Sequence, residues 1–139
     1  MRFELKHEER IESELTGLRP TATAPTVANA LYNRTTRECA IMCGLNVYEV
    51  YVIMLVSVFE GMSPWHLCLA GGTTTASMLP ALRRLSERGY IQKKLQPNCK
   101  KRSFVYLTEH GRTVVFRFNN RWADAVRSAS KFLLPPPEL

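Results

Sequence analysis

Basic residues gather in one short segment of the chain. Residues 83–102 contain eight basic side chains and one acidic side chain, Glu87, which gives the segment a net charge of +7. The whole chain also has a net charge of +7, so the rest of it is electrically balanced. The eight basic residues are Arg83, Arg84, Arg88, Lys93, Lys94, Lys100, Lys101 and Arg102. Charge confined in this way is typical of a surface that binds a polyanion; a solvated basic face without a partner is the alternative.

The stretch that leads into this cluster, "GGTTTASMLPALRRLSE" at 71–87, predicts a helix with two unlike faces. Helical spacing places four apolar residues on one side, where they can pack on a core. These four are Met78, Ala81, Leu82 and Leu85. The opposite side has Ala76, Pro80, Arg83 and Glu87, flanked by Ser77 and Arg84. The second side therefore has the composition of a contact surface, with a proline at its centre.

Pro80 constrains where this helix begins. If Ser77 is the N-cap, Pro80 lies in the first turn, where backbone N–H groups have no intrahelical partner and nothing is lost. If the helix begins at Thr73 or Thr74, Pro80 removes one backbone hydrogen bond at a cost of about 3 kcal/mol and kinks the helix. We favour Ser77 as the N-cap, or a start near Thr75 with a bent first turn.

If the polyanion is DNA, the same residues limit how such a helix could read it. Ala76 and Pro80 have no side-chain donor or acceptor, so at most they touch a thymine methyl group. Direct base reading falls to the polar residues of this segment, and Arg83 is expected on phosphate. The expected base-reading residues are Thr74, Thr75, Ser77 and Arg84. We therefore expect modest direct readout and an affinity dominated by phosphate contacts and DNA shape.

Hydrophobic patterning predicts the elements that must hold this segment in place. Helices are expected over 2–17, 26–43, 46–59, 63–70 and 109–133, and strands over 90–94 and 102–108, with a break at 19–25. Asn46 and Glu49 have capping-box spacing. Ser63 can cap the next helix, with Pro64 in its first position, and Thr108 can cap the last one. A helix-turn-helix followed by a hairpin is the order of a winged helix.

The segment from Leu45 to about Arg112 resembles the MarR family of bacterial transcription regulators. The matching stretches are "GLNVYEVYVIMLV", "LCLAGG", "LRRLSERGYIQKK" and "VYLTEHGR". The resemblance implies a mostly α fold with a small β-hairpin wing (α+β), namely a winged helix-turn-helix at 45–108. It also implies dimerisation through helices in 1–44 and 109–139, and binding to a pseudo-palindromic DNA site.

The tip of the predicted wing departs from that family. The usual pattern there is adjacent aspartates followed by arginines. This chain has Asn98, Cys99, Lys100, Lys101 and Arg102 instead. Lysine is a point charge without the planar fork of arginine. We therefore expect a wing that grips phosphate more than it reads shape.

The final helix has an apolar stripe that needs a cover. Its members are Val114, Val115, Phe118, Trp122, Ala125 and Val126. A partner subunit is the expected cover, and packing onto the N-terminal helices of the same chain is the alternative. The family resemblance also implies an aromatic-acid effector between the dimerisation and DNA-binding parts; the sequence itself leaves any effector unknown.

The sequence offers no pattern that indicates a metal site, a cofactor or catalysis. Its four cysteines, Cys39, Cys43, Cys68 and Cys99, form no CxxC pair. Cys39 and Cys43 would share a helix face, so metal binding or redox sensing is one interpretation, but burial as small apolar side chains is favoured. The three histidines, His7, His66 and His110, are widely spread. We expect neither enzymatic activity nor a cofactor.

These features together predict a homodimeric, DNA-binding transcription regulator of the bacterial cytoplasm, associated with the nucleoid. The segment 74–88 is expected in the major groove and the hairpin 90–108 on the backbone or minor groove. The expected DNA contacts are Thr74, Thr75, Ser77, Pro80, Arg83, Arg84, Lys93, Lys94, Lys100, Lys101 and Arg102. The alternative is a winged-helix adaptor whose basic wing docks on an acidic protein. No membrane is expected, because the start of the chain lacks an apolar segment and the apolar run at 50–59 is too short to span.

Overall fold

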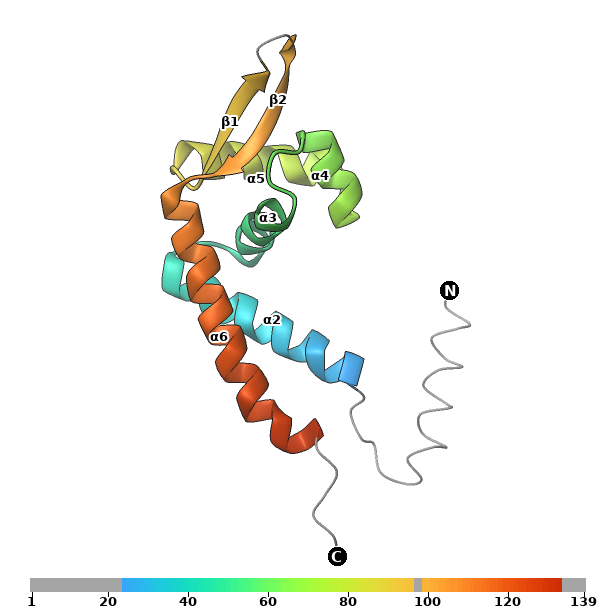
Figure 1. Ribbon diagram of the computed structural model, residues 1–139, viewed down its shortest axis with the longest axis vertical. Coiled ribbons are helices and arrows are strands. Elements are labelled where there is room, and N and C mark those ends of the chain that lie inside the picture. The colour runs from blue at the N-terminus through green and yellow to red at the C-terminus, as the bar shows by residue number, and fades with distance from the viewer. Residues whose placement is uncertain (1–23, 97–98, 134–139) are drawn as a thin grey trace, which may run out of the picture.

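The computed structural model describes residues 24–96 and 99–133, which form five helices and one hairpin (Figure 1). In chain order the elements are α2 (Ala24–Cys43), α3 (Val47–Val58), α4 (Pro64–Gly71), α5 (Thr75–Glu87), β1 (Ile91–Gln96), β2 (Cys99–Leu107) and α6 (Glu109–Leu133). This is the mostly α fold with a small β wing that the sequence predicts. The helix expected over 2–17 and most of the break expected over 19–25 lie outside the described residues.

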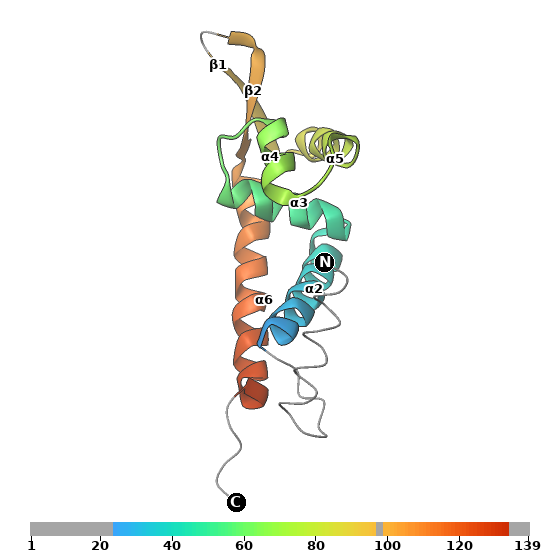
Figure 2. The same ribbon diagram turned by 90° about the vertical axis from the view of Figure 1, so that its right-hand side faces the viewer.

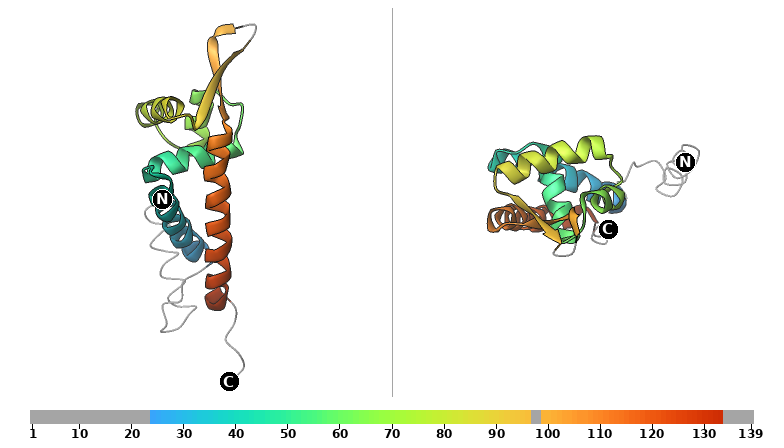
Figure 3. Two further views of the ribbon diagram at one scale, coloured as in Figure 1. Left: turned by 90° about the vertical axis from the view of Figure 1, so that its left-hand side faces the viewer. Right: turned by 90° about the horizontal axis from the view of Figure 1, so that it is seen from above.

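The described part divides into a lobe and a pair of helices. α3, α4, α5 and the hairpin form the lobe, while α2 and α6 extend away from it together (Figures 1 and 2). The hairpin projects from the lobe beyond α5 (Figure 3). α6 follows directly on β2, so the base of the wing continues into the long helix.

Local capping sets the ends of α3 and α4 as predicted. Asn46 accepts the Glu49 N–H through its side chain, and the Glu49 carboxylate accepts the Asn46 N–H, which completes the capping box of α3. Ser63 caps α4 with Pro64 at the first helical position. α4 ends at Gly72, whose φ of 62° is the left-handed conformation that glycine adopts without strain.

The start of α5 differs from the favoured prediction. The N-cap is Thr74, whose Oγ1 accepts the Ser77 N–H at 3.3 Å, so Ser77 as the N-cap is wrong and the start near Thr75 is confirmed. Pro80 consequently lies inside the helix, beyond its first turn. Because proline has no N–H, the carbonyl of Ala76 lacks the donor that normally comes from the residue four positions on. Thr74 therefore caps the helix before Ser77, the N-cap that the position of Pro80 favours.

The core of the lobe is made by α3 and the inner face of α5. Met78, Ala81, Leu82 and Leu85 are all buried, as their spacing predicts. They meet a buried face of α3 that includes Val50, Val52, Ile53 and Val56. Burying one such large aliphatic side chain contributes about 1.5–3 kcal/mol. This packing fixes α5 with its other face outward.

The two strands pair in antiparallel register, and the base of the hairpin is anchored to the lobe. Ile91 pairs with Leu107 and Lys93 with Val105, and the register shifts between Leu95 and Gln96. The strands run further toward the turn than the predicted 90–94 and 102–108. Val105 also forms an isolated bridge with Met62, in which the Val105 N–H donates to the Met62 carbonyl at 2.9 Å. The wing therefore projects from a fixed base.

α6 packs on α2 of the same chain. The Tyr32 ring lies 5.6 Å from the Phe118 ring and 6.3 Å from the Trp122 ring, measured between centroids. Val114 and Phe118 are buried by this contact and its surroundings. The inner part of the apolar stripe of α6 is thus covered by its own chain, which was the alternative to a partner subunit. The stripe alone no longer argues for a dimer.

Among residues 24–96 and 99–133, no single helix is long and apolar enough to cross a membrane. α2 and α3 are long and apolar enough only when taken together, and a bend of 103° separates them.

Candidate nucleic-acid interface

The outward face of α5 carries the residues that its spacing places there. Ala76, Pro80, Arg83 and Glu87 are exposed, as are Ser77 and Arg84 on the flanks. α5 lies at the outside of the lobe, with the hairpin rising beyond it (Figure 3). The helix carries little polar base-reading capacity at the middle of this face, because Ala76 and Pro80 sit there. Charge is concentrated at its C-terminal half.

The polar residues at the start of α5 are partly committed to local structure. The Thr74 hydroxyl accepts the Ser77 N–H and donates to the Ser77 Oγ at 3.2 Å. Thr73, in the turn just before, has its Oγ1 2.9 Å from the Tyr48 hydroxyl. Thr75 is exposed. Of the three predicted polar base readers at this end, Thr74 and Ser77 therefore also serve as parts of the helix cap.

The arginines of α5 differ in how they are held. The Nε of Arg84 lies 3.4 Å from Oε2 of Glu49, a residue of α3. One terminal nitrogen of Arg88 donates to the Gly44 carbonyl at 3.0 Å, and the other lies 3.9 Å from Oε1 of Glu49. Arg83 has no hydrogen bond or ion pair with another residue that the structure describes. The sequence assigns Glu49 only to a helix cap, and its second role is visible only in three dimensions.

The two lysines of β1 point to opposite faces of the hairpin. Lys93 shares its face with Val105, its partner across the ladder, and with buried Ile91. Lys94 lies on the other face, where its Nζ is 4.9 Å from the centroid of the Tyr106 ring. Both lysines are exposed. Because side chains alternate along a strand, the two lysines cannot contact the same part of a binding partner from the same side.

Most side chains of the wing tip lie outside the described part of the structure. β2 begins at Cys99, but the side chains of Lys100, Lys101 and Arg102 lie outside the described part of the structure, as does the whole of Asn98. Their expected phosphate contacts stay predictions.

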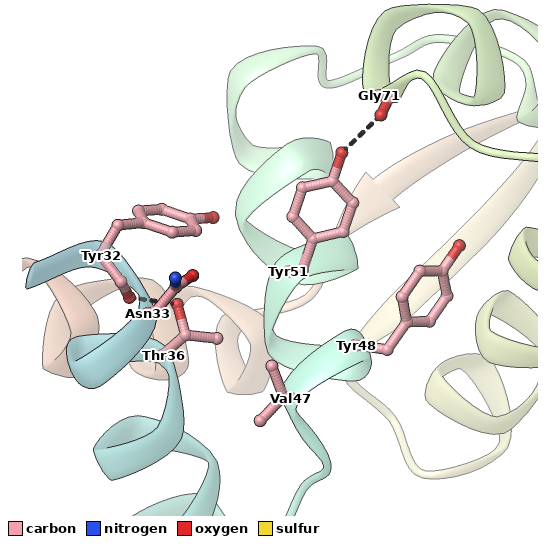
Figure 4. A pocket seen from close by; sticks show the side chains of 7 residues that line it. All are labelled: Tyr32, Asn33, Thr36, Val47, Tyr48, Tyr51 and Gly71. Atoms are coloured by element: carbon pink, nitrogen blue, oxygen red, sulfur yellow. Dashed lines mark hydrogen bonds between the residues drawn. The ribbon is translucent and has the colours of Figure 1, made fainter. Parts of the chain in front are cut away.

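A pocket of about 490 Å³ lies between α2, α3 and the end of α4 (Figure 4). Its lining consists of Tyr32, Asn33, Thr36, Val47, Tyr48, Tyr51 and Gly71. The Tyr51 hydroxyl donates to the Gly71 carbonyl at 2.8 Å, and burial, with a contribution from Tyr48, raises the pKa of Tyr51 and keeps it a donor. No charged residue belongs to this lining. An aromatic acid, which the family resemblance implies, would find no cationic partner in the wall.

Cys39 and Cys68 are buried thiols, while Cys43 is half-buried. Burial raises the pKa of Cys39 to about 12, with a further contribution from neighbouring Cys43, and the Cys39 thiol faces the Val114 carbonyl at 3.8 Å. Burial likewise raises the pKa of Cys68. A thiol that stays protonated is a poor nucleophile and metal ligand. Within the described ranges no three His, Cys, Asp or Glu residues are grouped to hold a metal ion.

The described histidines serve local structure. His66 Nδ1 is 2.6 Å from the Ser63 hydroxyl at the start of α4. His110 stacks on Tyr90 with ring centroids 4.2 Å apart. His7 lies outside the described residues.

Comparison with known proteins identifies the architecture. No protein-family model matches the sequence, and no curated protein sequence matches it. The fold matches those of solved structures, among them the following three. A mutant MarR from E. coli complexed with operator DNA is 18% identical, covers 75% of each chain and has a TM-score of 0.62. A mutant MepR from S. aureus bound to an oligodeoxyribonucleotide is 13% identical, with coverage of 72% of this chain and 74% of that chain and a TM-score of 0.64.

The third is the transcriptional regulator Tm0710 from Thermotoga maritima. It is 15% identical, covers 94% of this chain and 82% of its own, and has a TM-score of 0.65. At such low identity the comparison concerns the arrangement of helices and hairpin. The chain has the MarR-type winged-helix fold.

Proposed function

We propose that this protein is a transcription regulator that binds double-stranded DNA, with α5 in the major groove and the hairpin on the adjacent backbone or minor groove. The observation that carries the proposal is the exposed face of α5 with Arg83 and Arg84, on a helix that contacts the strand carrying the exposed Lys93 and Lys94. Two solved proteins of the same fold are bound to DNA, which supports the proposal. A regulator of this kind would act in a bacterial cytoplasm, at the nucleoid.

Phosphate contacts supply most of the affinity in this proposal. Arg83, Lys93 and the basic residues of the wing tip neutralise phosphates, and each such contact releases counterions. Direct readout is limited to Thr75, Arg84 and the partly committed hydroxyls of Thr74 and Ser77. Ala76 and Pro80 contribute apolar contact with thymine methyl groups.

The proposed regulator is a homodimer. α2 exposes Ile41 at 82% and Met42 at 44%, and α6 exposes Phe116 at 65%. Large apolar side chains left in water on the two helices that extend from the lobe favour burial against a second copy. A two-fold arrangement presents two recognition helices to a pseudo-palindromic site. Light scattering coupled to size-exclusion chromatography measures the mass directly, and a monomer at micromolar concentration contradicts this part.

The second candidate is an adaptor whose basic surface binds an acidic protein. The concentrated charge of residues 83–102 suits either partner. Salt dependence separates the two, because counterion release from DNA makes the logarithm of the binding constant fall linearly with the logarithm of salt concentration.

The test is fluorescence anisotropy of the purified protein with a mixed-sequence duplex across a salt series. The expected result is a steep negative slope that corresponds to several phosphate contacts per protomer. A positive result leads to selection of a preferred operator from a random library. An absence of binding even at low salt contradicts the proposal and directs the search to acidic protein partners.

A further inference from the structure

Glu49 is a buried carboxylate at the contact between α3 and α5. Its side chain is 5% exposed, although it belongs to the first turn of α3. A carboxylate removed from water is tolerated only where donors compensate it. Glu49 therefore depends on the groups that face it.

The two oxygens of this carboxylate have separate roles. Oε1 accepts the Asn46 N–H at 2.9 Å, which completes the cap of α3. Oε2 faces the Nε of Arg84 at 3.4 Å, a residue 35 positions further along the chain. The cap needs only one oxygen, so the ion pair with α5 is an additional function of the second one.

The geometry holds Arg84 from the side. A guanidinium carries one N–H on Nε and two on each terminal nitrogen, all in one plane. Glu49 engages the Nε edge, while half of the Arg84 side chain stays exposed, at 49%. The end of the fork, with its two terminal nitrogens, is left without a hydrogen bond to any other described residue. That end presents two N–H groups side by side, which can donate to O6 and N7 of guanine in bidentate recognition.

Arg88 completes the arrangement at the end of α5. It is tied to the Gly44 carbonyl and lies near Oε1 of Glu49, with its guanidinium carbon 5.5 Å from the centroid of the Tyr90 ring. The Arg88 guanidinium is therefore engaged by several groups. Arg84, in contrast, is held by a carboxylate at its Nε and has its terminal nitrogens exposed for a ligand. Arg83, exposed on the same helix, has no such support.

We propose that Glu49 is a positioning residue for sequence recognition: it fixes the plane of Arg84 so that this one arginine reads a guanine in the major groove. The proposal rests on the proposed DNA-binding function. A fork that is already oriented loses less conformational entropy on binding, so its bidentate geometry contributes to discrimination. Arg83, which is free to rotate, contributes attraction to phosphate without discrimination.

Glu49→Gln tests the proposal because an amide has a single oxygen. If that oxygen continues to accept the Asn46 N–H, the amino group of the glutamine faces the Nε of Arg84, and two donors cannot pair. The variant therefore retains the cap and releases Arg84. The measured quantity is the ratio of the dissociation constants for mixed-sequence duplex and for the operator obtained by selection, at one fixed salt concentration. We expect this ratio to fall about tenfold, while binding to mixed-sequence DNA is retained.

Two arginine variants serve as a matched pair. Arg84→Lys keeps the charge and removes the fork, so the ratio falls as in Glu49→Gln, and the double variant falls no further, because both changes remove the same interaction. Arg83→Lys keeps the ratio, since a point charge serves a phosphate equally well. Asp124→Asn, which removes an exposed acidic group of α6 paired with Arg127, controls for the change in net charge and leaves the ratio unchanged.

The outcomes separate this proposal from the general one. If the wild type does not bind mixed-sequence DNA, the proposed function fails. If it binds DNA but selection yields no preferred sequence, or if Glu49→Gln folds and keeps the full ratio, only the role of Glu49 is overturned. If Glu49→Gln does not fold, equal ratios for Arg84→Lys and Arg83→Lys overturn it.

Discussion

Toward the end of α5, Arg84 and the following Arg88 are held by tertiary contacts, whereas the two lysines of β1 lie on opposite faces of the hairpin. Arg84 and Arg88 meet a buried carboxylate and a backbone carbonyl that both come from the chain around α3. Lys93 has no hydrogen bond or ion pair within the described part of the chain, and Lys94 lies over Tyr106.

This difference separates two kinds of cationic surface that composition alone treats as one. A guanidinium held in one plane can distinguish one acceptor pattern from another. An ammonium on a flexible stem is attracted to any phosphate within reach, and salt weakens that attraction. In the proposed function, base reading therefore belongs to the held Arg84, and phosphate binding belongs to Arg83 and to the basic residues of the hairpin.

The largest effect is expected from restoring a regular backbone in α5. Pro80→Ala supplies the N–H that the Ala76 carbonyl lacks, so we expect the free energy of unfolding to rise by about 1–3 kcal/mol. Thermal and urea unfolding followed by circular dichroism measure it. Pro64→Ala is the matched control, because a proline at the first helical position blocks no hydrogen bond. Equal responses of the two variants would mean that Pro80 does not weaken α5.

The held arginine can be compared with the free one in stability. Arg84→Ala leaves the buried Glu49 with the Asn46 N–H and, as its cationic neighbour, only the more distant Arg88, so we expect a loss of about 1–2 kcal/mol in the free energy of unfolding. Arg83→Ala should stay within about 0.5 kcal/mol of wild type, since Arg83 is exposed and has no partner among the described residues. Urea titrations of both variants give the two numbers. A loss at Arg83 as large as that at Arg84 contradicts the distinction drawn between them.

The two faces of the hairpin can be compared through the salt dependence of DNA binding. Lys93 lies on the face that carries Ile91 and Val105, toward the helices, and we expect Lys93→Ala to reduce the log–log salt slope by about 1. The sequence predicts a DNA contact at Lys94 as well, but its side chain is turned to the other face, over Tyr106, so we now expect Lys94→Ala to leave the slope unchanged. Anisotropy titrations at several salt concentrations decide between them. A larger reduction of the slope for Lys94→Ala than for Lys93→Ala would place the DNA on the opposite side of the wing.

The smallest effect is expected from Cys39, in the α2–α6 pair that supports the lobe. Its pKa of about 12 in the folded chain lies above the ordinary 9.0. The folded state therefore binds this proton more tightly, and the resulting stabilisation is fully present below pH 9 and is lost as the pH rises toward 12. Between pH 7 and pH 8.5 we expect no change in stability from this group.

Thiol alkylation at pH 8, read by mass spectrometry, gives a second measure of the same environment. Half-buried Cys43 should react before Cys39. Rapid alkylation of Cys39 in the folded protein, or a peroxide treatment that changes DNA affinity, would revive the redox-sensing interpretation.

Much of the local structure could be predicted because it depends on neighbouring residues. The capping box at Asn46 and Glu49, the Ser63 cap and the buried face of α5 follow from spacing along one helix. The start of α5 could not be predicted uniquely, because Thr74 and Ser77 are both residue types that favour the N-cap position. The opposite orientation of Lys93 and Lys94 follows from the alternation of side chains along a strand.

The sequence by itself determined the order of helices and strands, the amphipathic face of α5 and the location of the charge, because these depend on periodicity and composition. The tertiary structure alone decided that Glu49 meets Arg84 across 35 residues and that α2 covers the stripe of α6. The reason is physical: capping and periodicity act within a turn or two, whereas a buried ion pair and an interhelical contact require two distant segments to be brought together by the core. The pattern of one segment carries no information about which of several distant carboxylates or apolar faces it will meet.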